Sequence, residues 1–115
     1  MPFLHVTSNA DAGPEAAEAV LHQCAGLCCD LLGKPADYMQ TAYHPASTMT
    51  MGSRQGPCVF AELKSIGLPG DSVQRLSEAL TTGLADGLGV PPENVYLVFQ
   101  DVPREQWAWN GRTFG

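Results

Sequence analysis

The chain has 115 residues, a length typical of one domain, and its twelve acidic and six basic residues give a formal net charge of -6. This charge excludes the basic surface that nucleic-acid binding needs. No apolar run of about 18 residues could span a membrane, and no signal peptide is evident. We therefore expect one domain over 1–115, cytoplasmic by default, with secretion without a signal peptide left open.

The first residues form an alternating apolar run that predicts a strand over 2–8. Pro2 directly follows the initiator methionine, and its chemistry depends on whether that methionine is removed. If Met1 is removed, Pro2 becomes a free secondary amine that can act as a base. If Met1 stays, the same nitrogen is a tertiary amide without basicity. The alternative interpretation of Pro2 is a residue that only begins a strand at a sheet edge.

A helix is predicted over about 14–32, because apolar residues recur there with a period near 3.6. Pro14 suits the first turn of this helix, and Gly33 is suited to end it. The later elements alternate in the same way. In chain order they are a strand over 38–44, a loop over 45–57, a strand over 58–66, a helix that begins within 68–72 and ends at Gly89, a strand over 95–100, and a tail with a hairpin turn at 110–111.

The four cysteines have neither the C-x-x-C spacing nor the second ligand pair that a metal or redox site requires. Free cysteine is often a small buried apolar residue, which is the interpretation we favour here. We expect no metal and no cofactor. The residues concerned are Cys24, Cys28, Cys29 and Cys58.

The two halves of the chain repeat one pattern. Residues 33–39 align with residues 89–95 at an offset of 89 − 33 = 56, and each segment contains a helix stop, a proline turn and a strand start. Two tandem βαβ units predict an α+β fold in which a four-stranded mixed sheet carries both helices on one face. The strand over 95–100 is apolar on both faces, which favours a partner chain over the second face. A tolerated exposed Val98 is the alternative.

Taken together, several short motifs make the chain resemble the macrophage migration inhibitory factor and D-dopachrome tautomerase branch of the tautomerase superfamily. No single motif is specific, but all of them stand in order at matching spacing over essentially the whole chain. They are Pro2, Gly33-Lys34-Pro35 with Tyr38, Pro57-Cys58, Lys64-Ser65-Ile66-Gly67, Val95-Tyr96 and Trp109-Asn110-Gly111-Arg112-Thr113-Phe114.

The resemblance implies a homotrimer whose sheets line a central barrel, with active sites between neighbouring subunits. It also implies keto–enol tautomerisation of a small enolisable keto acid, of the phenylpyruvate type, and of dopachrome. Pro2 would be the catalytic amine, and Lys34 would bind the substrate carboxylate. The remaining pocket residues that the resemblance implies are the Ile66 backbone, Ser65, Tyr38, Tyr96 from the adjacent subunit, Trp109 and Phe114.

The chemistry of Pro2 and Lys34 fits this activity on its own terms. Moving a proton from carbon to oxygen needs a base whose pKa lies near the working pH. An amine in an apolar pocket beside a lysine has a lowered pKa, since burial and a like charge both disfavour the ammonium form. The chain departs from the family at Val98, where asparagine often stands, and this removes a polar contact to substrate and alters substrate preference.

Two other functions remain open at this point. One is a cytokine-like signalling or binding protein whose pocket is incidental and whose partner is a cell-surface receptor. The other is a structural trimer with a vestigial site. The pocket residues would be shared by all three, so the sequence alone does not separate them.

Overall fold

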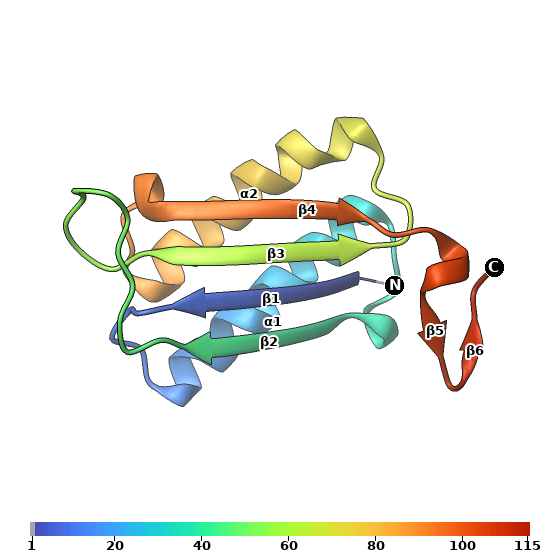
Figure 1. Ribbon diagram of the computed structural model, residues 1–115, viewed down its shortest axis with the longest axis horizontal. Coiled ribbons are helices and arrows are strands. Elements are labelled where there is room, and N and C mark those ends of the chain that lie inside the picture. Colours follow the sequence, from blue (N-terminus) through green and yellow to red (C-terminus); the bar gives the residue numbers. More distant parts are fainter. Residues whose placement is uncertain (1) are drawn as a thin grey trace.

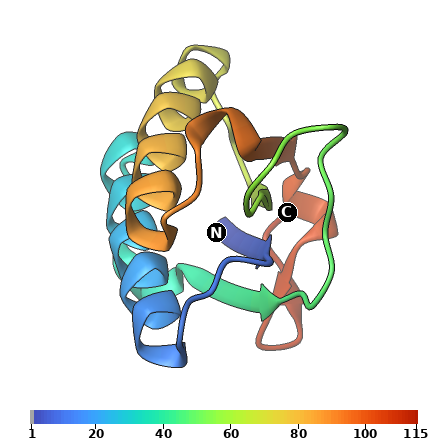
Figure 2. The ribbon, with the colours of Figure 1, turned by 90° about the vertical axis from the view of Figure 1, so that its left-hand side faces the viewer.

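The computed structural model describes residues 2–115 and contains a four-stranded sheet with two long helices packed on one face (Figure 1). Figure 2 shows both helices on the same side of the sheet. This arrangement confirms the expected α+β class. The elements are β1 (Pro2–Ser8), α1 (Pro14–Leu32), β2 (Gln40–Pro45), β3 (Val59–Ser65), α2 (Gly70–Leu88) and β4 (Val95–Asp101).

The sheet is mixed, as the tandem βαβ pattern predicts. Its strand order is β2-β1-β3-β4; β1 runs parallel to β2 and antiparallel to β3, and β3 runs parallel to β4. In this register Pro2 lies opposite Ser65, at the end of β3. The first residue of the described chain therefore sits in a central strand and not on an edge.

The core lies between the sheet and the helices. Alternate residues of β1 and β3 point toward the helices, and leucines of α2 pack against them, all fully buried: Leu4, Val6, Leu63, Leu76, Leu80 and Leu84. No helix within residues 2–115 has the length and hydrophobicity that crossing a membrane requires.

The cysteines belong to this core, as expected for free buried cysteine. Burial raises the pKa of the Cys24 thiol to about 11. Burial, followed by the neighbouring Cys24 and Cys29, raises the pKa of Cys28 to about 12. Both side chains therefore remain protonated thiols at neutral pH, and a protonated thiol is neither a nucleophile nor a metal ligand.

The two halves of the chain repeat in conformation as well as in sequence. Gly33 and Gly89 each end a helix with positive φ, at φ 64, ψ 36 and φ 68, ψ 39. The residue after each glycine donates its N–H to a helix carbonyl at 3.0 Å. A single 3-10 turn follows each, η1 (Ala36–Tyr38) and η2 (Pro92–Asn94). All of these pairs are 56 positions apart, the offset found in the sequence.

The predicted start of the second strand at residue 38 is wrong by two residues. Tyr38 closes η1, and β2 begins at Gln40. The Met39 N–H donates to the carbonyl of Ala36 at 3.1 Å, which holds one turn after the proline before the chain extends.

The C-terminal residues fold into a small hairpin at the end of the sheet where β1 begins (Figure 1). It consists of β5 (Ala108–Trp109) and β6 (Arg112–Thr113), and the turn η3 (Arg104–Gln106) precedes it. The turn residues Asn110 and Gly111 both have positive φ, 53 and 80. This is the conformation that an Asn-Gly hairpin turn requires, so that prediction is confirmed.

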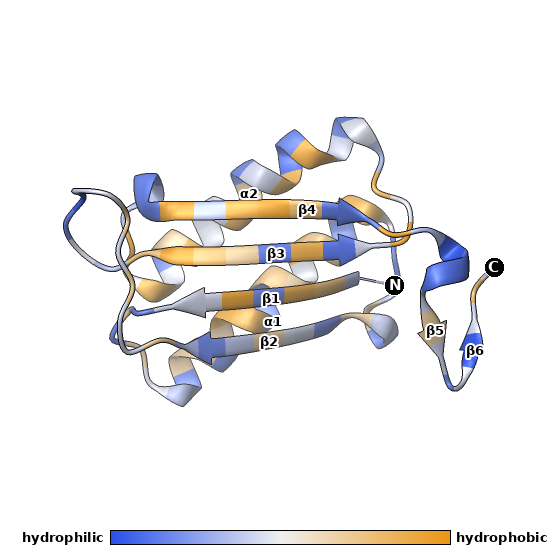
Figure 3. Cartoon of the chain, viewed as in Figure 1, coloured by the Kyte–Doolittle hydropathy of each residue, from blue (hydrophilic) through white to orange (hydrophobic). Residues whose placement is uncertain are grey.

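The second face of the sheet is not covered by this chain. Tyr96 and Val98 of β4 lie on it and are 61% and 42% exposed. Phe60 lies beside Tyr96 in the register between β3 and β4 and is also exposed. Figure 3 shows apolar colour along β3 and β4. The prediction that one face of the fourth strand is left open within the chain is therefore confirmed.

Candidate active site

A cavity of about 250 Å³ opens at the end of the sheet where β1 starts. Pro2 itself is fully buried and forms part of the cavity wall. The other lining residues come from four separate segments: the turn after α1, the residue after β3, the turn η3 and the C-terminal tail. The complete lining consists of Pro2, Lys34, Pro35, Tyr38, Ile66, Arg104 and Phe114.

Lys34 is held in place by the end of β3. Its Nζ donates a hydrogen bond to the carbonyl oxygen of Ile66 at 2.7 Å. The Ser65 hydroxyl donates to the same oxygen at 3.2 Å, so the two lone pairs of this carbonyl are both used. The lysine ammonium keeps two further N–H groups that are able to bind an anion.

The structure brings together most of the residues that the family resemblance implies. Pro2, Lys34, Ile66, Tyr38 and Phe114 all line the one cavity. The buried hydroxyl of Ser65 lies behind the cavity wall, where it bonds the Ile66 carbonyl and is paired across the sheet with Pro2.

Trp109 is placed at the edge of this cavity and not in its wall. Its ring contacts Tyr38 edge to face, with centroids 5.8 Å apart and planes at 89°. Trp109 and Tyr38 also border a neighbouring hollow of about 410 Å³ that reaches Pro2. Such aromatic pairs contribute roughly 0.5–1.5 kcal/mol beyond the area they bury, so this pair supports the open side of the cavity.

Tyr96 and Val98 do not lie near Pro2 within one chain. In the sheet register Tyr96 is opposite Phe60, and Pro2 is opposite Ser65. The two levels are 65 − 60 = 5 residues apart along β3, which is about 16 Å at roughly 3.3 Å per residue. Val98 is opposite Glu62, three residues or about 10 Å from the level of Pro2, and neither side chain lines the Pro2 cavity.

Arg104 lines the cavity and was not among the residues expected from the sequence. Its Nη2 donates to the carbonyl oxygen of Phe114 at 3.1 Å, which holds the tail beside η3. The signal available in the sequence was weak: a lone basic residue after Pro103, in a segment without periodicity. β4 ends at Asp101, opposite Ser65, which in turn lies opposite Pro2, and the turn η3 that follows carries Arg104 to the cavity.

The electrostatics of the cavity favour an anionic ligand. Two cationic side chains, Lys34 and Arg104, line it, and no carboxylate does. Within the part of the chain that the structure describes, the ion pairs lie elsewhere, between His22 and Glu18 and between Lys64 and Glu62. Residues 2–115 also hold no group of three or more metal-binding side chains. Anion binding by paired cations is therefore the chemistry that this site offers.

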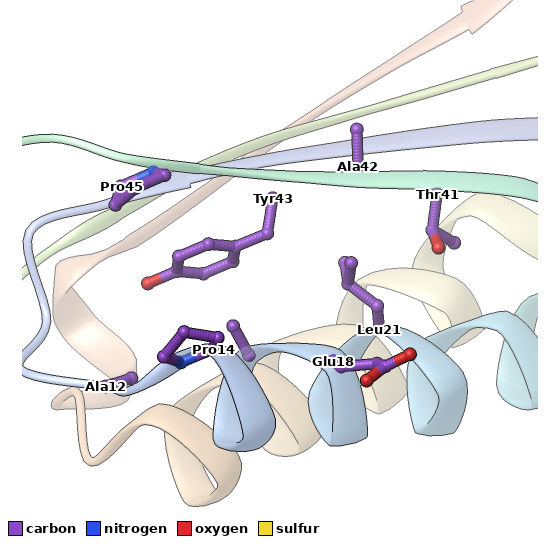
Figure 4. Close-up of a pocket in the computed structure, with 9 residues that line it drawn as sticks. Ala12, Pro14, Glu18, Leu21, Thr41, Ala42, Tyr43 and Pro45 are labelled. Carbon is purple, nitrogen blue, oxygen red and sulfur yellow. The ribbon is translucent and has the colours of Figure 1, made fainter.

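A larger hollow of about 580 Å³ lies between α1 and β2 and has different chemistry. Figure 4 shows the Tyr43 ring projecting from β2 toward Pro14, with Glu18 on the helix below. The Tyr43 hydroxyl is buried and has no hydrogen-bond partner. The lining contains no cation and no amine base, so the smaller cavity at Pro2 is the better candidate for an active site.

The question of whether Met1 is removed concerns a residue outside the described part of the chain. The described geometry begins at Pro2, whose ring is a wall of the cavity. The intact mass of the purified protein shows directly whether the Pro2 nitrogen is a free amine or is still bonded to Met1.

Comparison with known proteins finds relatives that are similar to this chain over its full length. The model of the family described as macrophage migration inhibitory factor matches residues 1–115. A macrophage migration inhibitory factor homolog of Brugia malayi is 32% identical over 116 residues and covers 100% of both chains. The crystal structure of a homologue from Prochlorococcus marinus is 33% identical with a TM-score of 0.90, covering 98% of this chain and 99% of that one. The macrophage migration inhibitory factor of Toxoplasma gondii is 28% identical with a TM-score of 0.91, covering 97% and 99%.

Proposed function

The chain belongs to the macrophage migration inhibitory factor family, a branch of the tautomerase superfamily, and we propose that it is a keto–enol tautomerase of phenylpyruvate-like α-keto acids. One observation carries the proposal: Pro2 lines a small cavity beside the cation of Lys34. An amine that accepts a proton and a cation that holds a carboxylate are the two groups that this reaction needs. Dopachrome is a second substrate of the same kind.

In the proposed mechanism, Pro2 acts as the general base after Met1 has been removed. The ring nitrogen takes a proton from the carbon next to the keto group, and the C–H electron pair becomes the carbon–carbon double bond of an enolate. The proton on Pro2 is then transferred to the former keto oxygen, directly or through water, which gives the enol. Lys34 binds the substrate carboxylate and orients the acidic carbon toward the nitrogen. No electrons leave the substrate, so no cofactor is consumed.

The surroundings of Pro2 favour the neutral amine that this mechanism requires. An unperturbed α-amino group has a pKa of about 7.7–8.0. Pro2 is fully buried, and Lys34 and Arg104 share its cavity. Burial and like charge both disfavour an ammonium ion, so both lower the pKa of the free amine. A larger fraction of Pro2 is then available as a base at neutral pH.

We propose further that three copies assemble and that Tyr96 and Val98 reach the cavity of a neighbouring copy. In the single chain both side chains are exposed on the uncovered face of the sheet, about 16 Å (Tyr96) and about 10 Å (Val98) from the level of Pro2 by the strand rise. Contact with another sheet would bury this apolar surface. Val98 would then present a methyl surface to the substrate, which favours apolar substrate groups at that point.

A cytokine-like function is the second candidate, and it rests on the relatives that bear the name macrophage migration inhibitory factor. In that case a cell-surface receptor would be the partner, and the Pro2 cavity would be incidental. Signalling that is independent of Pro2, by protein without tautomerase activity, would support this candidate. A secreted protein would also be expected, whereas a tautomerase could act in the cytoplasm.

The decisive experiment begins with the intact mass of the purified protein, which shows whether Met1 has been removed. Phenylpyruvate tautomerisation is then measured for the wild type and for Pro2→Gly. We expect kcat/KM to fall by about 100-fold or more, the usual contribution of a positioned general base. Pro14→Gly is the matched control, because this exposed proline begins α1 outside the cavity. Retained Met1, or equal rates in wild type and Pro2→Gly, would overturn the proposed mechanism.

A further inference from the structure

Resting on the proposed function, we infer that the Pro2 cavity takes substrates with two anionic groups, the enolisable α-keto dicarboxylates. Lys34 holds one carboxylate and Arg104 holds the other. The inference assigns to Arg104 a role in choosing the substrate, beyond its contact with the tail. Among α-keto acids it predicts a preference for those with a second charge, while phenylpyruvate would use only the Lys34 side of the cavity.

The first argument is the concentration of positive charge. The chain has only six basic residues against twelve acidic ones, yet two of the six line one cavity of about 250 Å³. No acidic side chain lines that cavity. Lys34 is half-buried and Arg104 is exposed, so water screens their mutual repulsion, but a ligand with a single negative charge can pair with only one of them. A dianion neutralises both.

The second argument is hydrogen-bonding capacity. Lys34 uses one N–H on the Ile66 carbonyl, and Arg104 uses one on the Phe114 carbonyl. A lysine ammonium has three N–H donors and an arginine guanidinium has five, so each cation keeps several. Both partners are neutral carbonyls, and within residues 2–115 neither cation forms an ion pair with a carboxylate within 4.0 Å. The two bonds orient the cations and leave their charge for a ligand.

The third argument is that the two cations are held on separate segments. Lys34 follows α1 and is tied to the residue after β3, whereas Arg104 stands on η3 and is tied to the tail. A ligand with charges at both ends would contact both segments at once. The cavity lies below the usual range of about 300–1,000 Å³ for small-molecule sites, which suits a short diacid of four or five carbons.

The competing explanation is that Arg104 serves only as a clamp on the tail, which also supplies Phe114 to the cavity. The two explanations differ in what happens when the arginine is replaced. A clamp that is lost would weaken the binding of every ligand alike. A carboxylate site that is lost would weaken the binding of diacids selectively.

The test uses two ligands that differ only in the second charge, 2-oxoglutarate and its 5-methyl ester. Their dissociation constants are measured by calorimetry on the full-length protein, with wild type, Arg104→Gln, Arg104→Lys and Arg112→Gln. Arg112 is the matched control, because it is an exposed arginine of β6 that does not line the cavity. Binding is measured without turnover, so the result does not depend on Pro2 acting as a base.

We expect wild type and Arg112→Gln to bind the diacid about tenfold or more tightly than the ester, since a hydrogen bond to a charged group contributes about that much. Arg104→Gln should reduce the ratio to within about twofold, and Arg104→Lys should retain most of it. A ratio near one in the wild type overturns the inference. So does an equal loss for both ligands in Arg104→Gln, which would identify a clamp. If Pro2→Gly retains phenylpyruvate activity while the ratio behaves as expected, the base is wrong and the diacid site stands.

Discussion

The turns that follow α1 and α2 have nearly the same backbone conformation, but their side chains have very different surroundings. Gly33 and Gly89 end their helices with φ 64 and φ 68, and each is followed by a proline and one 3-10 turn. In the first repeat the residue after the glycine is Lys34, which lines the cavity. In the second it is Val90, which is buried in the core. Figure 1 shows these two turns at opposite ends of the sheet.

The covering segments explain why one end is open and the other closed. At the second end Asn94 donates from Nδ2 to the carbonyls of Gln55 and Pro57, both at 3.0 Å, and the long connection between β2 and β3 folds over it. At the first end the equivalent residue, Tyr38, is 42% exposed, whereas Asn94 is 1% exposed. The same backbone turn thus occurs after both helices, and the candidate site lies at the turn that no other segment covers. Function lies in residues added to a frame, not in the frame itself.

At the closed end, Asn94→Ala should have the largest effect on the stability of the protein. The substitution removes both hydrogen bonds to the connection, each worth about 0.5–1.5 kcal/mol, and leaves a void where the buried Asn94 side chain packed. We expect the free energy of unfolding to fall by about 2–4 kcal/mol, measured by urea denaturation. The cavity at Pro2 lies at the other end of the sheet, so the catalytic activity of the folded fraction should be retained.

Tyr38→Ala is the matched control for this experiment, because Tyr38 is the residue 56 positions earlier in the first repeat. It is exposed, and its edge-to-face contact with Trp109 is worth about 1.5 kcal/mol at most. Its stability loss should be clearly the smaller of the two. Equal losses in the two variants would contradict the distinction between an open and a closed end.

At the open end, replacing Lys34 with valine, the residue at the equivalent position 90 of the second repeat, should lower the catalytic activity. We expect Lys34→Val to lower kcat/KM for phenylpyruvate by about 10–100-fold, because a charge-assisted contact to the carboxylate is lost. Removing this neighbouring positive charge also raises the pKa of the Pro2 amine. The rising, acid limb of the pH profile of kcat/KM should therefore move to higher pH.

Lys34→Arg is the control for charge, since arginine restores the cation at the same position. It should recover part of the rate and return the limb of the profile toward its wild-type position. If the pH profile did not move in Lys34→Val, Lys34 would have no influence on the pKa of Pro2, and its role would be limited to substrate binding.

Much of the fold could be predicted from the sequence, because the repeat left clear local signals. The glycine stops, the prolines after them and the apolar periods fixed the order of the elements, and Asn110-Gly111 specified its turn. The 3-10 turn ending at Tyr38 was missed, because a single turn after a proline resembles a strand start.

The candidate site was less predictable, for a physical reason. Five separate segments form its walls, and the arrival of Phe114 beside Arg104 depends on how a short hairpin folds back, a property without periodicity in the sequence. Pro2 was singled out from its place directly after Met1, whereas the role of Lys34 was expected only through the family resemblance. The proposed place of Tyr96 in the site would depend on a neighbouring copy, which no pattern within one chain can specify.

The smallest effects, and the sharpest comparison of the two ends, should come from Gly33→Ala and Gly89→Ala. Neither position has an atom within 4 Å of the added Cβ, so no clash contributes. The whole cost comes from holding alanine at positive φ, about 1 kcal/mol in each variant. Urea denaturation should therefore give equal losses for the two, within about 0.5 kcal/mol.

Their functional consequences should differ, because only one of these glycines precedes a cavity residue. Relaxation of the strained turn in Gly33→Ala moves Lys34, and kcat/KM should fall a few-fold, whereas Gly89→Ala should retain the wild-type value. Gly26→Ala in the middle of α1 is the control of opposite sign: it also has open space around the new Cβ, and helical alanine gains about 0.5–1 kcal/mol over glycine. If Gly89→Ala lowered kcat/KM as much as Gly33→Ala, the turn after α2 would influence the Pro2 cavity from the opposite end of the sheet. The proposed independence of the two ends would then be wrong.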